Sequence, residues 1–197
     1  MDLFGALNYP WLTLTNGKIL WVEHFIDKEE ADVLQATLRE TVPWSQEKIT
    51  LFGRSVSQPR LQAWYGDKAY TYSGLTLTPT PLPPSLEALK SRCEISAQQN
   101  FNSVFLNLYR DGQDSMGAHQ DNEPELGPNP TIASLSLGST RRFVLKHTQT
   151  AQRHVLELTH GSLLVMSGEL QHYWKHSVPK TTKPVGERIN LTFRCLL

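Results

Sequence analysis

The pattern of apolar and polar positions divides the chain into two parts, and the first part contains both predicted helices. Asp27 is a favourable N-cap residue, Glu30 follows at capping-box spacing, and apolar residues then recur at helical spacing to about Glu40. Ser85 has the same capping character before a second helical pattern, which extends to about Gln98. We therefore expect two helices within the first hundred residues.

The remainder of this first part predicts short extended segments. Residues 9–25 alternate loosely around a turn at Asn16-Gly17, which predicts a hairpin. Residues 48–52 predict a strand, and residues 60–65 are expected to return as its partner. The proline-rich residues 73–84 indicate a loop or extended segment inside a domain, not a linker between domains.

From residue 103 onward the pattern changes to short strands separated by turn residues. The predicted strands are 104–109, 132–137, 142–147, 154–158, 162–166, a short one near His176, and 188–194. Short strands divided in this way are typical of a sandwich or barrel. Two helices followed by these strands predict an α+β chain in which the strands form a jelly roll.

Composition narrows the class of protein. A chain of 197 residues is of ordinary single-domain size, and 19 basic side chains balance 19 acidic ones, so no global positive field marks a nucleic-acid binder. Residues 139–185 nevertheless hold 7 basic and 2 acidic side chains, which permits a local basic face. Two cysteines are too few for a disulfide framework, and no apolar run approaches a membrane span. We expect an intracellular monomer without a membrane segment, cytoplasmic in a bacterium and nuclear in a eukaryote.

The strand predicted over residues 188–194 carries the first chemical signal. Successive side chains of a strand point to opposite faces, so Ile189, Leu191 and Phe193 share an apolar face. The opposite face holds two arginines and two neutral polar groups, Arg188, Asn190, Thr192 and Arg194. Arginine binds carboxylates and phosphates bidentately, so this face suits a small dianion. A solvated outer face of a half-buried strand is the alternative.

A candidate metal site lies upstream of that strand. His119 and Asp121 are two residues apart, so in an extended segment both side chains fall on one face. One distant histidine would complete the two-His-one-carboxylate triad of non-haem Fe(II) oxygenases. His172 and His176 are both possible on physical grounds. The alternative for the His119–Asp121 pair is a solvated turn after Gly117.

These residues together resemble the AlkB family of Fe(II)- and 2-oxoglutarate-dependent nucleic-acid dealkylases. The resemblance covers roughly residues 42–197. The motifs that carry it are His119-x-Asp121, His176, Arg188-x-Asn190-x-Thr192-x-Arg194, and the segments 107–112, 132–138 and 161–166. It implies a single dioxygenase domain over residues 1–197, a double-stranded β-helix. Residues 1–100 would supply the supporting helices and a nucleotide-recognition hairpin region, and residues 101–197 the catalytic core.

The resemblance also implies the ligands and the reaction. His119, Asp121 and His176 would be the catalytic metal ligands. Arg188, Asn107 and Tyr109 would bind the far carboxylate of 2-oxoglutarate. Arg194 and Asn190 would lie nearer the metal-chelating end, with Thr192 assisting. With dioxygen, 2-oxoglutarate would be converted to succinate while an N-methyl group is hydroxylated and lost as formaldehyde.

The expected substrate is alkylated DNA, with 1-methyladenine and 3-methylcytosine as the lesions. In the resemblance, Tyr72 and Ser73 belong to the segment that stacks on the flipped base, and Glu123 accepts a hydrogen bond from its exocyclic amino group. The segment with Phe52 and Arg60 is similar to the duplex-DNA branch, where an apolar finger residue fills the vacated space. Basic side chains would contact phosphates, and the candidates are Arg141, Arg142, Lys146, Lys175 and Lys180. An RNA demethylase and an inactive nucleic-acid-binding jelly roll are the alternatives.

Overall fold

The computed structural model describes residues 9–51, 54–72 and 75–197. Its first element is the predicted hairpin, formed by β1 (Trp11–Leu14) and β2 (Gly17–Val22). Asn16 takes the left-handed conformation at the turn, with a φ of 54°. Asparagine tolerates this conformation better than most residues, so the hairpin prediction is confirmed.

Helix α1 (Lys28–Thr41) begins where the capping signal predicted. The backbone N–H of Glu30 donates to the Asp27 carboxylate at 2.8 Å. Helix α2 (Pro84–Ala97) begins two residues earlier than expected, with Pro83 at the N-cap and no side-chain cap. The prediction of Ser85 as the N-cap is therefore wrong, because Pro84 already has the fixed φ that the first helical position favours.

The predicted pairing of residues 48–52 with residues 60–65 is also wrong. Strand β3 (Lys48–Leu51) pairs with β4 (Arg54–Ser57). Strand β5 (Leu61–Gly66) pairs instead with β8 (Ser103–Tyr109), in the main sheet. Joining this sheet buries one face of β5 against the helices and the other against the interior, which a two-stranded hairpin cannot do.

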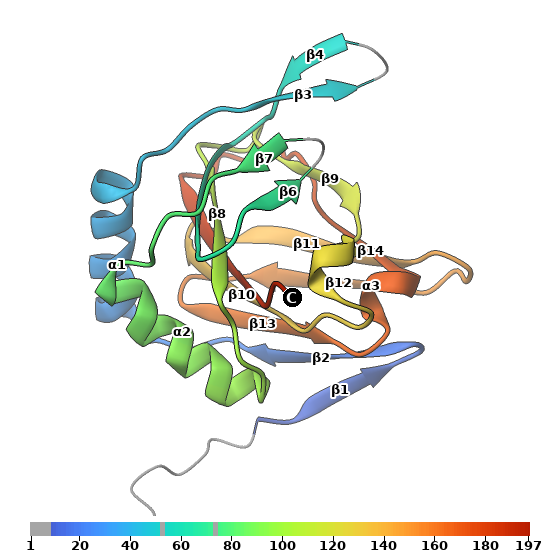
Figure 1. Cartoon of the computed structure of the whole chain (residues 1–197). Helices are drawn as coiled ribbons and strands as arrows, with labels where there is room; N and C mark the ends of the chain where they lie inside the picture. Colours follow the sequence, from blue (N-terminus) through green and yellow to red (C-terminus); the bar gives the residue numbers. More distant parts are fainter. Residues whose placement is uncertain (1–8, 52–53, 73–74) are drawn as a thin grey trace, which may run out of the picture.

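A second short hairpin, which the pattern did not predict, overlaps the start of the proline-rich segment. Strand β6 (Tyr70–Tyr72) pairs with β7 (Leu75–Leu77). Phe52 and Ser73, two of the predicted substrate residues, lie outside the described residues. The β3–β4 hairpin extends from one end of the molecule, and β6–β7 lies near the same end (Figure 1).

Two antiparallel sheets form the jelly roll. The larger has the order β1-β2-β13-β10-β15-β8-β5 and the smaller the order β12-β11-β14-β9. The remaining strands are β9 (Met116–His119), β10 (Ile132–Gly138), β11 (Arg141–His147), β12 (Arg153–Leu158), β13 (Ser162–Ser167), β14 (Trp174–Val178) and β15 (Arg188–Arg194). A 3-10 turn, η1 (Pro124–Leu126), follows β9, and a short helix, α3 (Leu170–Tyr173), precedes β14. The predicted α+β fold with a jelly roll and two supporting helices is confirmed.

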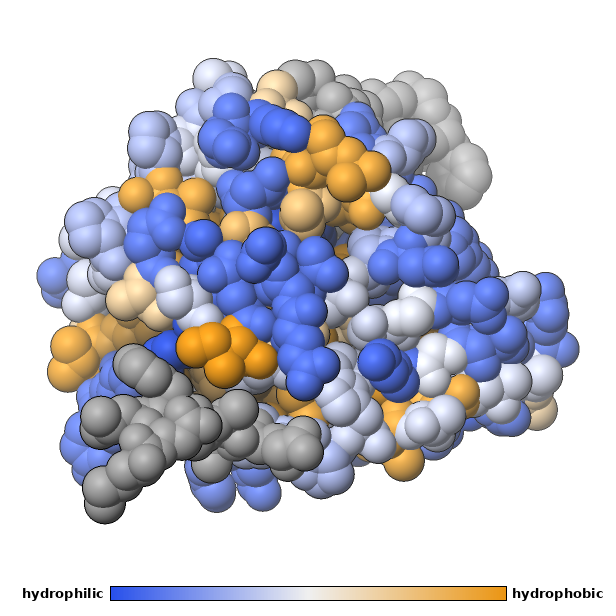
Figure 2. All heavy atoms as spheres, turned by 60° about the horizontal axis from the view of Figure 1, so that its bottom comes forward, coloured by the Kyte–Doolittle hydropathy of each residue, from blue (hydrophilic) through white to orange (hydrophobic). Residues whose placement is uncertain are grey.

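The two helices cover the outer face of the larger sheet (Figure 1). Leu38 of α1 and Leu86 of α2 pack in one apolar cluster with Leu135 and Leu191 of the sheet. A second cluster fills the space between the two sheets, where Phe143 and Trp174 lie. The face seen in Figure 2 is mostly hydrophilic with separate apolar spots. Among the described residues, no helix is both long enough and apolar enough to span a membrane.

Candidate metal and 2-oxoglutarate site

Strand β15 places alternate side chains in the apolar core and in an interior cavity. Ile189, Leu191 and Phe193 are buried in the cluster beneath the helices. The polar residues of the other face line a cavity of about 500 Å³, its open mouth included, and are Arg188, Asn190, Thr192 and Arg194. All four are buried, so this face is not a solvated outer surface.

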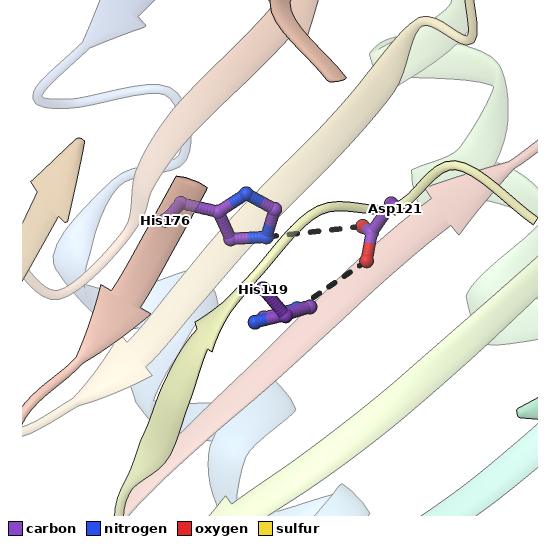
Figure 3. Close-up of side chains that lie close together, drawn as sticks. All are labelled: His119, Asp121 and His176. Carbon is purple, nitrogen blue, oxygen red and sulfur yellow. Dashed lines mark ion pairs between the residues drawn. The ribbon is translucent and has the colours of Figure 1, made fainter. Parts of the chain in front are cut away.

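His119, Asp121 and His176 converge in the same cavity (Figure 3). His119 ends β9 and faces His176 of the neighbouring strand β14 in the sheet register. Nε2 of His119 lies 3.3 Å from Oδ1 of Asp121, and Nε2 of His176 lies 4.0 Å from Oδ2. One donor atom of each residue lies within 4.8 Å of the other two, a spacing that permits a shared metal ion.

The two histidines that the spacing left open are now distinguished. His176 points into the cavity, whereas His172 lies on α3, is exposed, and its Nε2 contacts the carbonyl of Pro128. His119 is held in a defined orientation because its Nδ1 lies 2.9 Å from the carbonyl of Gly117, which can only accept. Nδ1 therefore carries the proton, and Nε2 is left as the metal-binding atom.

The surroundings in the cavity favour the protonation states in which Asp121 and His176 bind metals. Burial alone would raise the pKa of Asp121, but Arg194 and the two histidines hold it well below its usual value. Arg194 donates from Nη2 to Oδ2 of Asp121 at 2.9 Å. Burial, with the nearby His119, lowers the pKa of His176 to about 3 against the opposing effect of Asp121. Asp121 is thus ionised and His176 neutral near pH 7, as metal ligation requires.

A divalent metal ion would compensate the charge of a buried carboxylate oxygen at this site. Oδ1 of Asp121 is buried and has no hydrogen-bond donor among the residues that the structure describes. A carboxylate oxygen in such surroundings is costly unless a cation or a donor meets it. The donor set therefore fits Fe(II), with His119, Asp121 and His176 as the residues that would hold it.

Arg188 has the features of a carboxylate-binding group. It is 1% exposed, and its Nη2 donates to the hydroxyl of Ser136 at 2.9 Å. Nε and Nη1 have no partner among the described residues. Burial lowers the pKa of Arg188 to about 10, with Tyr109 acting in the opposite direction, so it remains charged at neutral pH. A buried cation with two unused donors fits the far carboxylate of 2-oxoglutarate.

Asn107, Asn190 and Thr192 also line the cavity and have hydrogen-bond partners in the protein, and Tyr109 lies there with the Arg188 guanidinium over its ring. Oδ1 of Asn107 accepts from Nε of Arg60 at 2.6 Å, so the group of Asn107 that can donate to a carboxylate is its amide N–H. Nδ2 of Asn190 donates to Ser134 and to the carbonyl of Leu135. Thr192 donates to Asn190 at 3.1 Å. These side chains form a network that holds the cavity wall in shape.

Two predicted substrate residues have described side chains, and their positions differ. Arg60 is only 3% exposed and bonds to Asn107, so it lies beneath the cavity wall and not on a solvent-facing rim. Glu123 is half-buried, two residues after Asp121, at the start of η1. Tyr72 is the last residue of β6.

Arg141 does not belong to a phosphate-binding surface, contrary to the prediction. It is 2% exposed, and its guanidinium donates to the carbonyls of Asp111, Asp114 and Pro179. It therefore fastens the turn before β9 to the segment after β14. The alternation along β11 carried the signal, since Arg141 falls on the same face as the buried Phe143.

Comparison with known proteins agrees with this site. The model of the 2OG-Fe(II) oxygenase superfamily matches residues 18–194, so the chain belongs to that superfamily and its cofactors are Fe(II), 2-oxoglutarate and dioxygen. Within it, the chain is 42% identical over 184 residues to the mouse protein named DNA oxidative demethylase ALKBH2, covering 86% of this chain and 77% of that one. This places it in the AlkB family, as the sequence predicted.

Two further comparisons add to the picture. Mouse alpha-ketoglutarate-dependent dioxygenase alkB homolog 3 is 43% identical over 180 residues, which cover 86% of this chain. The match spans 63% of that relative. The solved structure of OsALKBH1 matches with a TM-score of 0.67 over 94% of this chain and all of that chain. At 17% identity, this likeness supports the fold alone.

Proposed function

We propose that the protein removes methyl groups from N1 of adenine and N3 of cytosine in DNA by oxidative demethylation. The observation that carries the proposal is the meeting of His119, Asp121 and His176 in the cavity lined by Arg188 and Arg194. The mouse relative's name, DNA oxidative demethylase, supports the same reaction class.

Bound Fe(II), with 2-oxoglutarate and dioxygen, supplies the oxidation of an N-methyl group, which yields formaldehyde, succinate and carbon dioxide. The protein's contribution is ligation and orientation. Arg188 would bind the far carboxylate of 2-oxoglutarate through its unused donors. Arg194 would lie near the chelating end while it holds Asp121 ionised. The apolar side chains of Phe143 and Met166 exclude water from the same cavity.

A row of basic residues lies on the outer face of the smaller sheet, the face turned away from His176, and offers a surface to the phosphates of a nucleic acid. Lys146 of β11 lies opposite Arg153 of β12 on one side and Lys175 of β14 on the other. All three are exposed. Like charges directly across strands repel, so a polyanion that binds over this row would relieve the repulsion. We refer to Lys146, Arg153 and Lys175 as the basic row.

The base-recognition residues are proposed from the sequence. A base must leave the helical stack to reach a cavity of this depth. Tyr72 and Ser73 would lie against the flipped base, and Glu123 would accept a hydrogen bond from its exocyclic amino group. Phe52 would occupy the space that the base leaves in a duplex. Arg60 would act indirectly, through its hydrogen bond to Asn107.

The decisive experiment offers methylated oligonucleotides to the Fe(II)-loaded protein. Protein prepared without oxygen is mixed with 2-oxoglutarate and with DNA or RNA of the same sequence, containing 1-methyladenine or 3-methylcytosine, and air is then admitted. We expect loss of one methyl group from the DNA, with formaldehyde and succinate formed in equal amounts. Succinate without demethylation of either polymer would refute a nucleic-acid substrate, and faster turnover of the RNA would make the protein an RNA demethylase.

A further inference from the structure

The segment between β13 and β14 contains a buried amide that meets the metal-binding loop. Gln171 of the short helix α3 is fully buried. Its Oε1 accepts the backbone N–H of Asp121 at 3.0 Å. Its own backbone carbonyl accepts from Nε2 of Gln120 at 2.9 Å. Two hydrogen bonds therefore join α3 to Gln120 and Asp121, the two residues that follow His119.

Asp121 needs such a partner because it lies beyond the end of a strand. β9 ends at His119, and the N–H of Asp121 consequently takes no part in the pairing of β9 with β14. A buried backbone N–H without an acceptor costs about 1–3 kcal/mol. Fixing this N–H orients the peptide plane that leads into Cα of Asp121, and so restricts the directions in which the side chain can leave the backbone.

The same segment leads directly to the other ligand strand. α3 continues into β14, which carries His176 five residues after Gln171. The start of β14 is anchored by Trp174, whose indole N–H donates to the carbonyl of Thr15 at 2.8 Å. Gln171 thus links the loop that presents Asp121 to the anchored segment that presents His176.

A role as a mere core filler does not explain the choice of glutamine at this position. Among the residues that the structure describes, the second polar atom of the side chain, Nε2, has the sulfur of Met166 as its partner, at 3.8 Å. A thioether is a weak acceptor, so this contact offsets little of the cost of burying an amide. An apolar side chain of the same length would fill the space without that cost. The hydrogen bond to Asp121 is the strong interaction that the amide provides.

We propose that Gln171 is a positioning residue for the metal centre, holding the carboxylate of Asp121 at the place where it meets the two histidines. This inference rests on the proposed ligand set. Partners that orient metal ligands typically change metal affinity 10–100-fold when they are removed. Gln171→Met, which keeps the length but removes the acceptor, should therefore weaken metal binding at least about tenfold.

Co(II) titration of the metal-free protein tests the proposal without any turnover. Affinity is measured by calorimetry, and the ligand geometry by the visible absorption of bound Co(II). Gln171→Met is compared with Gln171→Glu, which keeps an acceptor oxygen in the same place. Asp27→Ala is the control, because it removes the α1 cap and lowers stability far from the cavity. Asp121→Asn tests the ligand set itself.

The expected result is weaker Co(II) binding and an altered spectrum for Gln171→Met, with affinity recovered in Gln171→Glu and unchanged in Asp27→Ala. Unchanged Co(II) affinity in a folded Gln171→Met would overturn the inference. If Asp121→Asn also bound Co(II) normally, the ligand set itself would fail. Should Gln171→Met not fold, amide exchange in the Zn(II)-loaded wild-type protein decides. A protected Asp121 N–H supports the proposal, and an amide that exchanges as fast as an open loop refutes it.

Discussion

Arg194 and Asp121 form a buried ion pair in which one guanidinium nitrogen lies 2.9 Å from the carboxylate oxygen Oδ2. The arginine belongs to β15, an interior strand of the larger sheet, and the aspartate follows β9, the edge strand of the smaller one. The pair therefore joins the two sheets across the cavity. A positive charge in this place keeps Asp121 ionised before any metal binds.

Replacing Arg194 by methionine should destabilise the metal-free protein by about 3 kcal/mol, because a buried carboxylate loses its partner. Saturating Co(II) should recover part of this loss, since the metal supplies positive charge at the same carboxylate. Thermal unfolding with and without Co(II) measures both effects. An equal metal-induced rise in Tm for the wild type and for Arg194→Met would contradict the prediction.

Arg188→Met should weaken the binding of 2-oxoglutarate much more than the binding of DNA. Loss of a buried charged partner costs about 2 kcal/mol or more, which corresponds to a KM for 2-oxoglutarate raised roughly 30-fold. The KM for methylated DNA should change little. Arg92→Ala provides the control, since Arg92 lies on α2, is partly exposed and pairs with Glu30 of α1. Equal losses for both substrates would mean that Arg188 serves the fold and not the co-substrate.

Removing the basic row should reduce DNA affinity without regard to sequence. The slope of log affinity against log salt is negative. Its magnitude should fall by about one for each of the variants Lys146→Ala, Arg153→Ala and Lys175→Ala. Affinity measured by fluorescence anisotropy at several salt concentrations gives that slope. A slope that stays at the wild-type value in the triple variant would place the DNA elsewhere.

Asp114 should make stability depend on pH. Burial would raise the pKa of Asp114, but its hydrogen bonds with Arg110 outweigh this effect and lower it. A lowered pKa contributes stability above the unfolded value of about 3.9, and the contribution is lost as pH falls toward the folded value. Asp114→Asn should cost about 1 kcal/mol at pH 7, because Arg110 is partly exposed. In denaturant titrations, the difference in unfolding free energy between the wild type and Asp114→Asn should become smaller below about pH 4.

Local alternation was the most reliable guide to this fold. β15 occupies residues 188–194 as predicted, and its polar face lines the cavity. The partner of β5 was not predictable in the same way. Strand pairing between distant segments depends on which faces become buried, and the 36 residues between β5 and β8 give no local sign of it.

The missed residues share a physical reason. Gln171 acts through a backbone group of a segment far away in the sequence, and such a contact leaves no periodic pattern. Arg141 also bonds to distant backbone groups, and for it the alternation along β11 indicates burial alone, without its partners. His176 was separable from His172 only by the family resemblance, since both could have shared a strand face. The structure separates them because α3 ends between the two residues and turns His172 outward.

The place of β9 in its sheet has a mechanical consequence. β15 is hydrogen-bonded to a neighbour on each side, whereas β9 ends the smaller sheet and has β14 as its neighbour there. Arg188 and Arg194 therefore lie on a strand that is paired along both edges, whereas His119 lies on a strand with one neighbour in its sheet, and local opening is expected to start at such an edge. We expect loss of the metal to begin with local opening at β9, so that His119 separates from the metal before His176 does.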